Sequence, residues 1–223
     1  MVTGMRDQQF TPERHVSVYG SHEGKSKRWE LSGSEEELKE VLPLAVQHPP
    51  NQCFPRFVKN PYPDVVLGDH DNDMLKIDFD ERYYYEVYRL CMILVKKYPV
   101  LDNGFIILQS STKTHKIKKI GNSLPDVSND VVYSYKLRSF HAVFNGVVSK
   151  DEINSILAWL CEKVKDWNLI KWFHMQLIKG TYTLRIGFKG KKRPPIIVKR
   201  YGNQDKQIRK FLENRNFILE FLE

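Results

Sequence analysis

Two aspartates separated by one residue form the first group in the chain whose type and spacing could do chemistry. They lie in residues 74–80, MLKIDFD, where apolar and polar residues alternate as in a β-strand with one buried face. Asp78 and Asp80 are therefore expected on the same face of that strand. Two carboxylates so placed can bind one divalent cation or bridge two, and such oxygen ligands hold Mg²⁺ or Mn²⁺ against phosphate oxygens. Two solvated acids at a strand end are the alternative interpretation.

A second group follows in the segment KLRSFHAVFNG, within a strand that we expect over residues 131–145. Ser139 and His141 fall on one face of this strand, and Lys136 and Arg138 come just before them. A hydroxyl group, an imidazole and nearby cations suit the phosphates of a bound nucleotide. A purely structural histidine would give the same pattern.

The third group surrounds Arg185 in the segment TYTLRIGFKGKKRPP. A buried arginine side chain is expected to bind a negatively charged partner. Glycines beside lysines allow the backbone to approach a phosphate closely. The lysines that follow are Lys189, Lys191 and Lys192. A basic hairpin turn without a ligand is the alternative interpretation.

The charge of the chain is compatible with a polyanionic partner. The 223 residues carry a formal net charge of +8, and residues 112–120 and 189–200 are rich in basic residues and contain no acid. Such segments favour phosphate-rich partners through counterion release, although solvated basic loops have the same composition. The three cysteines form no zinc-binding or disulfide pattern, and neither a signal peptide nor a membrane span is recognisable. We therefore expect an intracellular protein of the cytoplasm or nucleus that does not contact membranes.

Helices and strands interleave along the chain and must position these groups. Residues 1–33 are polar and are expected to be peripheral or flexible, whereas residues 34–223 are expected to form one domain. Ser-x-x-Glu capping boxes at Ser34 and Ser149 predict two helix starts. The other predicted helices span 81–98 and 205–222, and the predicted strands span 74–80, 104–110, 131–145, 182–187 and 195–201. The expected fold class is α+β with one central sheet system.

The order of the three groups resembles that of the archaeo-eukaryotic primase (AEP) superfamily. That family has an Asp-x-Asp strand, then a Ser-x-His strand, then a Thr-Leu-Arg strand followed by a lysine, and residues 74–192 show the same order. The resemblance is to the primase-polymerase branch, and especially to the N-terminal primase domain of poxvirus-type helicase-primases. It implies an RRM-like catalytic core with a mixed central sheet flanked by helices.

The resemblance also implies roles for individual residues. Asp78 and Asp80 would ligate the catalytic metals, Mg²⁺ or Mn²⁺. The residues that it places around the triphosphate of the incoming nucleotide are Lys136, Arg138, Ser139, His141, Arg185 and Lys191.

The family pattern is broken where a third metal-binding acid is expected, because this chain has His174 there. Imidazole can ligate Mn²⁺ but is a poor ligand for Mg²⁺. Three interpretations stay open. His174 is a catalytic metal ligand in a Mn²⁺-dependent enzyme, another acid such as Asp166 completes the site, or the domain binds without catalysing.

The resemblance therefore predicts a template-directed nucleotidyltransferase, a DNA primase or primase-polymerase that uses nucleoside triphosphates on single-stranded DNA. Because the chain contains no helicase motif, a replicative helicase is expected as a partner in trans or in a longer chain. The competing interpretations are a catalytically degenerate replication protein that binds single-stranded nucleic acid, and an unrelated basic α+β domain.

Overall fold

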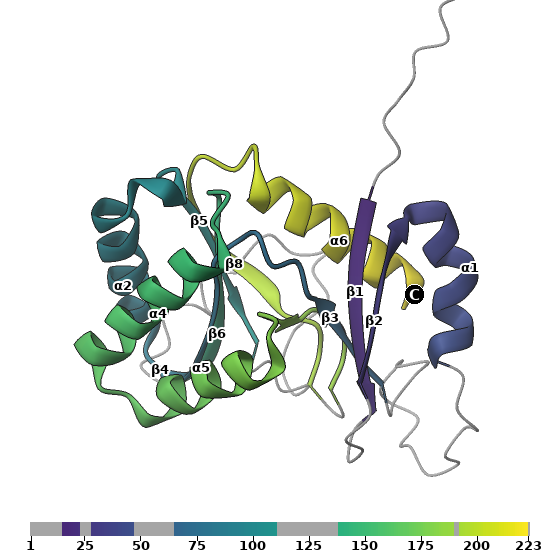
Figure 1. Cartoon of the computed structure of the whole chain (residues 1–223), viewed down its shortest axis with the longest axis horizontal. Coiled ribbons are helices and arrows are strands. Elements are labelled where there is room, and N and C mark those ends of the chain that lie inside the picture. Colours follow the sequence, from purple (N-terminus) through teal and green to yellow (C-terminus); the bar gives the residue numbers. More distant parts are fainter. Residues whose placement is uncertain (1–14, 23–27, 47–64, 111–137, 190–191, 223) are drawn as a thin grey trace, which may run out of the picture.

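A computed structural model describes residues 15–22, 28–46, 65–110, 138–189 and 192–222 of the chain (Figure 1). The helices are α1 (Glu35–Val46), α2 (Tyr84–Lys97), α4 (Lys150–Val164), α5 (Trp167–Lys179) and α6 (Gln207–Phe221), with a short 3₁₀ helix η1 (Pro99–Leu101). The strands are β1 (His15–His22), β2 (Arg28–Ser34), β3 (Val65–Asp69), β4 (Lys76–Arg82), β5 (Gly104–Gln109), β6 (Arg138–Phe144), β7 (Leu184–Arg185) and β8 (Ile196–Gly202).

Two four-stranded sheets organise these strands. Sheet A has the order β2-β1-β3-β7, sheet B has the order β4-β6-β5-β8, and each of these pairings is antiparallel. The expected α+β class is therefore confirmed. The expectation of one mixed central sheet is wrong for the described residues, because β1, β2 and β3 build a second sheet to which β7 belongs.

The segment before the first predicted helix contributes more to the fold than its polar composition suggests. β1 and β2 pair along most of their length, and Val16 and Val18 of β1 are fully buried. The alternation of these valines with polar residues is a strand signal, which the polar surroundings obscure. The structure thus differs from the expected peripheral segment at β1 and β2, while residues 1–14 and 23–27 lie outside the described ranges.

Sheet B is covered on both faces. Helices α2, α4 and α5 pack against one face, here called the helical face, whereas α6 and sheet A cover the other, here called the inner face (Figure 1). Alternate residues of β5 therefore enter different cores, with Phe105 on the helical face and Ile106 on the inner face. A strand buried on both faces is a continuous apolar run, which explains why this strand could be predicted.

Both predicted capping boxes are present and start helices α1 and α4. The Ser34 N–H donates to the Glu37 carboxylate at 2.9 Å, and the Glu37 N–H donates to Ser34 Oγ at 3.3 Å. Ser149 and Glu152 exchange the same two bonds at 2.9 and 3.4 Å. These bonds satisfy backbone N–H groups that a helix start leaves unpaired. Within the described residues, no helix combines the length and apolar character needed to cross a membrane.

Candidate functional site

Asp78 and His141 face each other on neighbouring strands at the inner face of sheet B. They are directly opposite in the antiparallel pair of β4 and β6, and His141 Nε2 lies 3.6 Å from Asp78 Oδ1. Alternation sets this orientation, because the adjacent Phe79 and Phe140 are buried in the core of the helical face. The structure thus brings the first two predicted groups together.

Both side chains are largely removed from solvent. The side-chain exposure is 26% for Asp78 and 4% for His141. Asp78 Oδ1 and His141 Nδ1 are buried and have no hydrogen-bond partner among the described residues. Because buried polar atoms are nearly always satisfied in folded proteins, these two atoms keep bonding capacity that a ligand or an ion could use.

The surroundings raise the pKa of Asp78 and lower the pKa of His141, and both shifts favour the uncharged form of the side chain. Burial, assisted by the charge of Asp80, raises the pKa of Asp78 to about 7. Burial, assisted by nearby positive charges, lowers the pKa of His141 to about 3. The rise in the pKa of Asp78 is opposed by the positive charges of Arg185, Lys189 and Lys192. At neutral pH His141 is therefore uncharged, and without a bound cation Asp78 is only partly ionised.

Arg185 is held by backbone carbonyl groups. Its guanidinium donates hydrogen bonds to the carbonyl oxygens of Gly187 at 2.6 Å, Arg193 at 2.9 Å and Ser110 at 2.6 Å. These bonds fasten the segment that follows β7 to the end of β5. Arg185 therefore acts as an anchor, and its charge influences Asp78 from that position.

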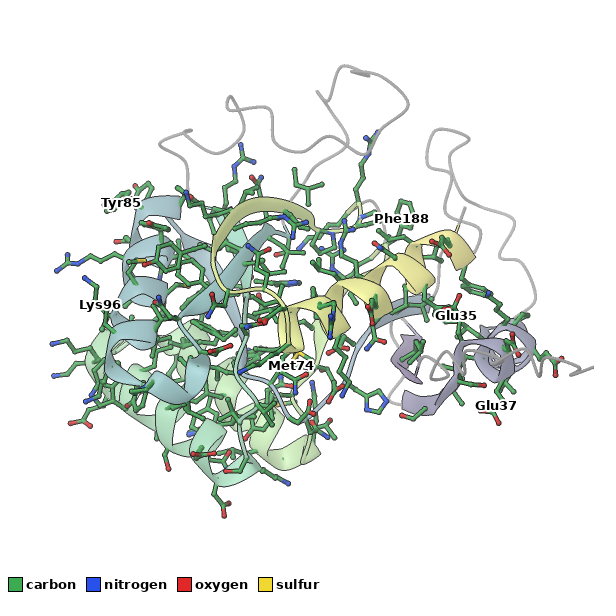
Figure 2. The ribbon with its side chains drawn as sticks, turned by 90° about the horizontal axis from the view of Figure 1, so that it is seen from above. Glu35, Glu37, Met74, Tyr85, Lys96 and Phe188 are labelled. Carbon is green, nitrogen blue, oxygen red and sulfur yellow. The ribbon has the colours of Figure 1, made fainter. Side chains whose placement is uncertain are left out.

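A basic segment, here called the basic hairpin and formed by the described residues 186–189 and 192–195, carries the third predicted group. Lys189 and Lys192 exchange two backbone hydrogen bonds, at 3.1 and 2.9 Å, and both side chains are exposed. Figure 2 shows the neighbouring Phe188 beside α6, where it packs against the inner-face core. Lys191, like Lys136 of the second group, lies outside the described residues. Among the described lysines of the hairpin, Lys189 and Lys192 are therefore the ones that act on Asp78. The run of lysines after Arg185 was the sequence signal for them.

Asp80 lies at an irregularity of β4. The regular pairing of β4 with β6 shifts between Phe79 and Arg82, and Glu81 has a positive φ of 53°. A bulge bends a strand and redirects its side chains, and such features are frequent beside functional sites. The direction of the exposed Asp80 is therefore set by this bulge as well as by simple alternation.

The other described residues of the second group lie at the start of β6. Ser139 is half-buried and belongs, by alternation, to the same face as His141. Arg138 is opposite Arg82, and its Nε atom is buried without a hydrogen-bond partner among the described residues. Both are therefore next to the bulged end of the strand that carries the aspartates.

His174 is not brought to the aspartates. Residues 167–179 form helix α5, whose Leu169 and Phe173 are buried in the core of the helical face, and His174 is exposed on it. Asp166 caps this helix, since its Oδ1 accepts the N–H groups of the next turn, and it also forms an ion pair with Arg82. The apolar spacing of a helix was the available signal against a metal-binding position in this segment.

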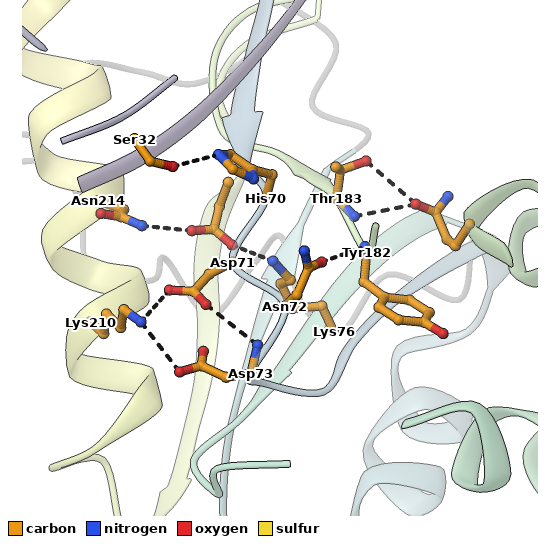
Figure 3. A network of polar contacts seen from close by, with 12 residues as sticks. Ser32, His70, Asp71, Asn72, Asp73, Lys76, Tyr182, Thr183, Lys210 and Asn214 are labelled. Carbon is orange, nitrogen blue, oxygen red and sulfur yellow. Dashed lines mark hydrogen bonds and ion pairs between the residues drawn. The ribbon is translucent and has the colours of Figure 1, made fainter. Parts of the chain in front are cut away.

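A buried ion pair that the sequence did not indicate links the two sheets next to the site. Lys76 of β4 and Asp69 of β3 form this pair, and both side chains are 0% exposed. Asn214 of α6 donates a hydrogen bond to Asp69 at 2.7 Å (Figure 3). Because β3 pairs with β7 and places Gly68 opposite Arg185, this network ties the aspartate strand to the strand of the anchoring arginine.

Comparisons of the chain with protein-family models, with curated proteins and with solved structures find no match. The function is therefore inferred from the geometry of the site together with the order of its sequence groups.

Proposed function

We propose that the chain is a DNA primase or primase-polymerase of the archaeo-eukaryotic primase type, a template-directed nucleotidyltransferase that makes or extends primers. The observation that carries this proposal is the antiparallel pairing of β4 with β6, which sets Asp78 of the Asp-x-Asp group opposite His141 of the Ser-x-His group. The basic hairpin that follows the Thr-Leu-Arg strand supplies positive charge to the same carboxylate. The proposal includes an RRM-like catalytic core, without the mixed central sheet that the resemblance implied, since the described strands form two antiparallel sheets.

The donor atoms fit a divalent cation that is held jointly with the phosphates of a nucleotide. Asp78 and Asp80 supply carboxylates, and Asp78 Oδ1 is buried without a partner among the described residues. Mg²⁺ is commonly bound by one or two carboxylates together with substrate phosphates and waters. No three His, Cys, Asp or Glu side chains of the described part form a metal cluster, so phosphates and waters would complete the coordination. When bound, Mg²⁺ or Mn²⁺ would activate the 3′-hydroxyl group and neutralise charge on the leaving pyrophosphate.

The protein side chains would mainly position charge. The exposed Lys189 and Lys192 would bind the triphosphate, whose α-phosphorus is attacked by the 3′ oxygen while pyrophosphate leaves. The neutral His141 can donate one hydrogen bond to a phosphate oxygen without adding charge to the site. Fixed donors and charges of this kind supply much of the acceleration in phosphoryl transfer.

The test is synthesis of labelled product from nucleoside triphosphates on single-stranded DNA, with Mg²⁺ and Mn²⁺ in separate reactions. We expect the Asp78→Ala/Asp80→Ala variant to lose at least about a hundredfold in rate, because both carboxylate ligands are removed. The control is His174→Ala, an exposed position on the opposite side of sheet B, which should keep the activity. Equal product from the double variant and the unaltered chain would refute the proposal.

A second candidate function is single-stranded nucleic-acid binding without catalysis. The observation that favours it is the exposed lysine pair beside an aspartate that is only partly ionised at neutral pH, because this arrangement attracts phosphate without needing a cation. Template binding without product under either metal would favour this candidate. The primase proposal itself also calls for a replicative helicase, in trans or in a longer chain.

A further inference from the structure

Helix α5 exposes an unusual amount of apolar surface. Its exposed large side chains are Trp167 at 74%, Met175 at 42%, Leu177 at 43% and Ile178 at 79% exposure. The other exposed large apolar residues of the described part are separated in the fold, since Val41 lies on α1, Tyr85 on α2 and Val147 in the loop between β6 and α4. Single exposed apolar residues are ordinary, whereas several on one element mark an interaction surface.

The exposed side chains form a stripe along the helix. Trp167, Lys171, His174 and Ile178 are spaced by four, three and four residues, which places them on one face. The opposite face is buried through Leu169, Phe173 and Gln176. We define the α5 outer face as the surface formed by Trp167, Lys171, His174, Met175, Leu177 and Ile178. The buried side of α5 enters the helical-face core through Leu169 and Phe173, whereas Asp78 lies on the inner face of sheet B.

Helix α5 itself carries a positive charge. Helix α5 contains Lys171 and Lys179 and no acidic residue. The end of α4 and the junction that follows it hold Lys163 and Lys165 beside Glu162 and Asp166, and Asp166 forms an ion pair with Arg82. An occupant with acidic residues beside its apolar contacts therefore fits best.

We propose that the α5 outer face docks an amphipathic helix of a partner protein, with aspartates and glutamates bordering its apolar stripe. Thirteen residues of α5 extend about 20 Å, which matches about four turns of a partner helix. Recognition of a helix through anchors at i, i+4 and i+7 is a common binding mode, and tryptophan is a frequent anchor.

The same surface disfavours two other occupants. A second copy of the chain packed through α5 would set Lys171 against lysine and histidine with no acid on either helix to neutralise them. Single-stranded nucleic acid binds by stacking on aromatic rings, whereas three of the four large apolar side chains are aliphatic or thioether groups.

The experiment measures binding of a designed probe to the full chain and does not depend on nucleotide synthesis. The probe is a labelled helical peptide of about four turns with a leucine stripe bordered by glutamates, and its matched control carries lysines in place of the glutamates. Fluorescence anisotropy should show binding of the glutamate peptide at least about tenfold tighter than that of the lysine peptide. The Lys171→Glu variant should reduce this preference.

The variant Trp167→Ser/Ile178→Ser should weaken binding of the glutamate peptide by about tenfold or more, because both anchors are removed. Its matched control, Tyr85→Ser/Val147→Ser, removes exposed apolar side chains from α2 and from the loop before α4, and it should change binding by less than about twofold. Absence of peptide binding, equal binding of both peptides, or unchanged binding by the Trp167/Ile178 variant would overturn the proposal. Displacement of the peptide by a single-stranded oligonucleotide, or self-association that Ile178→Glu abolishes, would assign the surface to one of the other occupants.

Discussion

At the scale of single residues, burial moves Asp78 and His141 toward neutrality from opposite sides. Burial disfavours the charged form of each group, so the carboxyl gains affinity for its proton and the imidazole loses it. The pair therefore presents little charge to an empty site while keeping a carboxylate oxygen and a ring nitrogen in place. A cation bound with a triphosphate would restore the ionised form of Asp78.

This shift makes the stability of the protein depend on pH. The pKa of Asp78 is about 7 in the folded protein and 3.8 for an unperturbed group, so the folded state binds more protons between these values. The free energy of unfolding should fall as pH rises from about 4 to 7, by at most about 4 kcal/mol. Asp78→Asn carries no titrating group at this position and should remove this fall. The difference in free energy of unfolding between the variant and the unaltered chain should therefore change in favour of the variant between pH 5 and pH 8.

Urea denaturation at both pH values, without divalent cations, measures this effect. Glu36→Gln, an exposed position on α1, is the matched control and should shift stability equally at both pH values. A difference between Asp78→Asn and the unaltered chain that is the same at pH 5 and pH 8 would show that Asp78 ionises normally.

At the scale of elements, the basic hairpin has a fixed base and two exposed lysines. Arg185 holds its base through three carbonyl groups, while Lys189 and Lys192 stay exposed. Charge at such a position attracts an anion from solution and costs little desolvation before binding. The hairpin is thus the element expected to decide affinity for the triphosphate.

Removal of the hairpin lysines should therefore weaken nucleotide binding. Lys189→Ala/Lys192→Ala should lower the affinity for a non-hydrolysable nucleoside triphosphate by about tenfold to a hundredfold and reduce its salt dependence. Calorimetric titration at low and high salt measures both quantities. The control Arg89→Ala/Lys96→Ala removes two exposed cations from α2, where Figure 2 shows Lys96 far from the hairpin residue Phe188. Equal losses in both variants would mean that the affinity reflects net charge alone.

At the scale of the whole molecule, the Asp69–Lys76–Asn214 network joins both sheets and α6. Its ion pair is fully buried, and the hydrogen bond from Asn214 satisfies a second oxygen of the carboxylate. One turn earlier in α6, Lys210 pairs with Asp71 and Asp73 in the β3–β4 connection (Figure 3). The relative position of the aspartates and the basic hairpin thus depends on contacts between elements far apart in the chain.

Breaking the buried pair should destabilise the fold strongly. Lys76→Met keeps the volume of the side chain but leaves Asp69 charged and buried, which should cost about 3–5 kcal/mol of the free energy of unfolding. Adding Asp69→Asn should recover part of this loss, because the uncompensated charge disappears. Lys39→Met, which breaks an exposed pair with Glu35 on α1, is the control and should cost less than about 0.5 kcal/mol. Denaturant titration measures all three, and a small loss for Lys76→Met would mean that Asp69 is solvated or protonated.

The sequence by itself determined the local features of this protein. The capping boxes at Ser34 and Ser149, the alternation of β4 and the apolar run of β5 could be predicted, because each depends on contacts within a few residues. The grouping of Asp-x-Asp with Ser-x-His was predicted from their order along the chain.

Only the tertiary structure decided how these parts meet. The division into two sheets, the opposition of Asp78 and His141, the carbonyl partners of Arg185 and the burial of Lys76 all join residues that are distant in sequence. If each strand were considered alone, these charged residues would be interpreted as exposed to solvent. Pairing register and burial arise when the strands assemble, because only then do neighbours remove water and set the charges that a side chain meets.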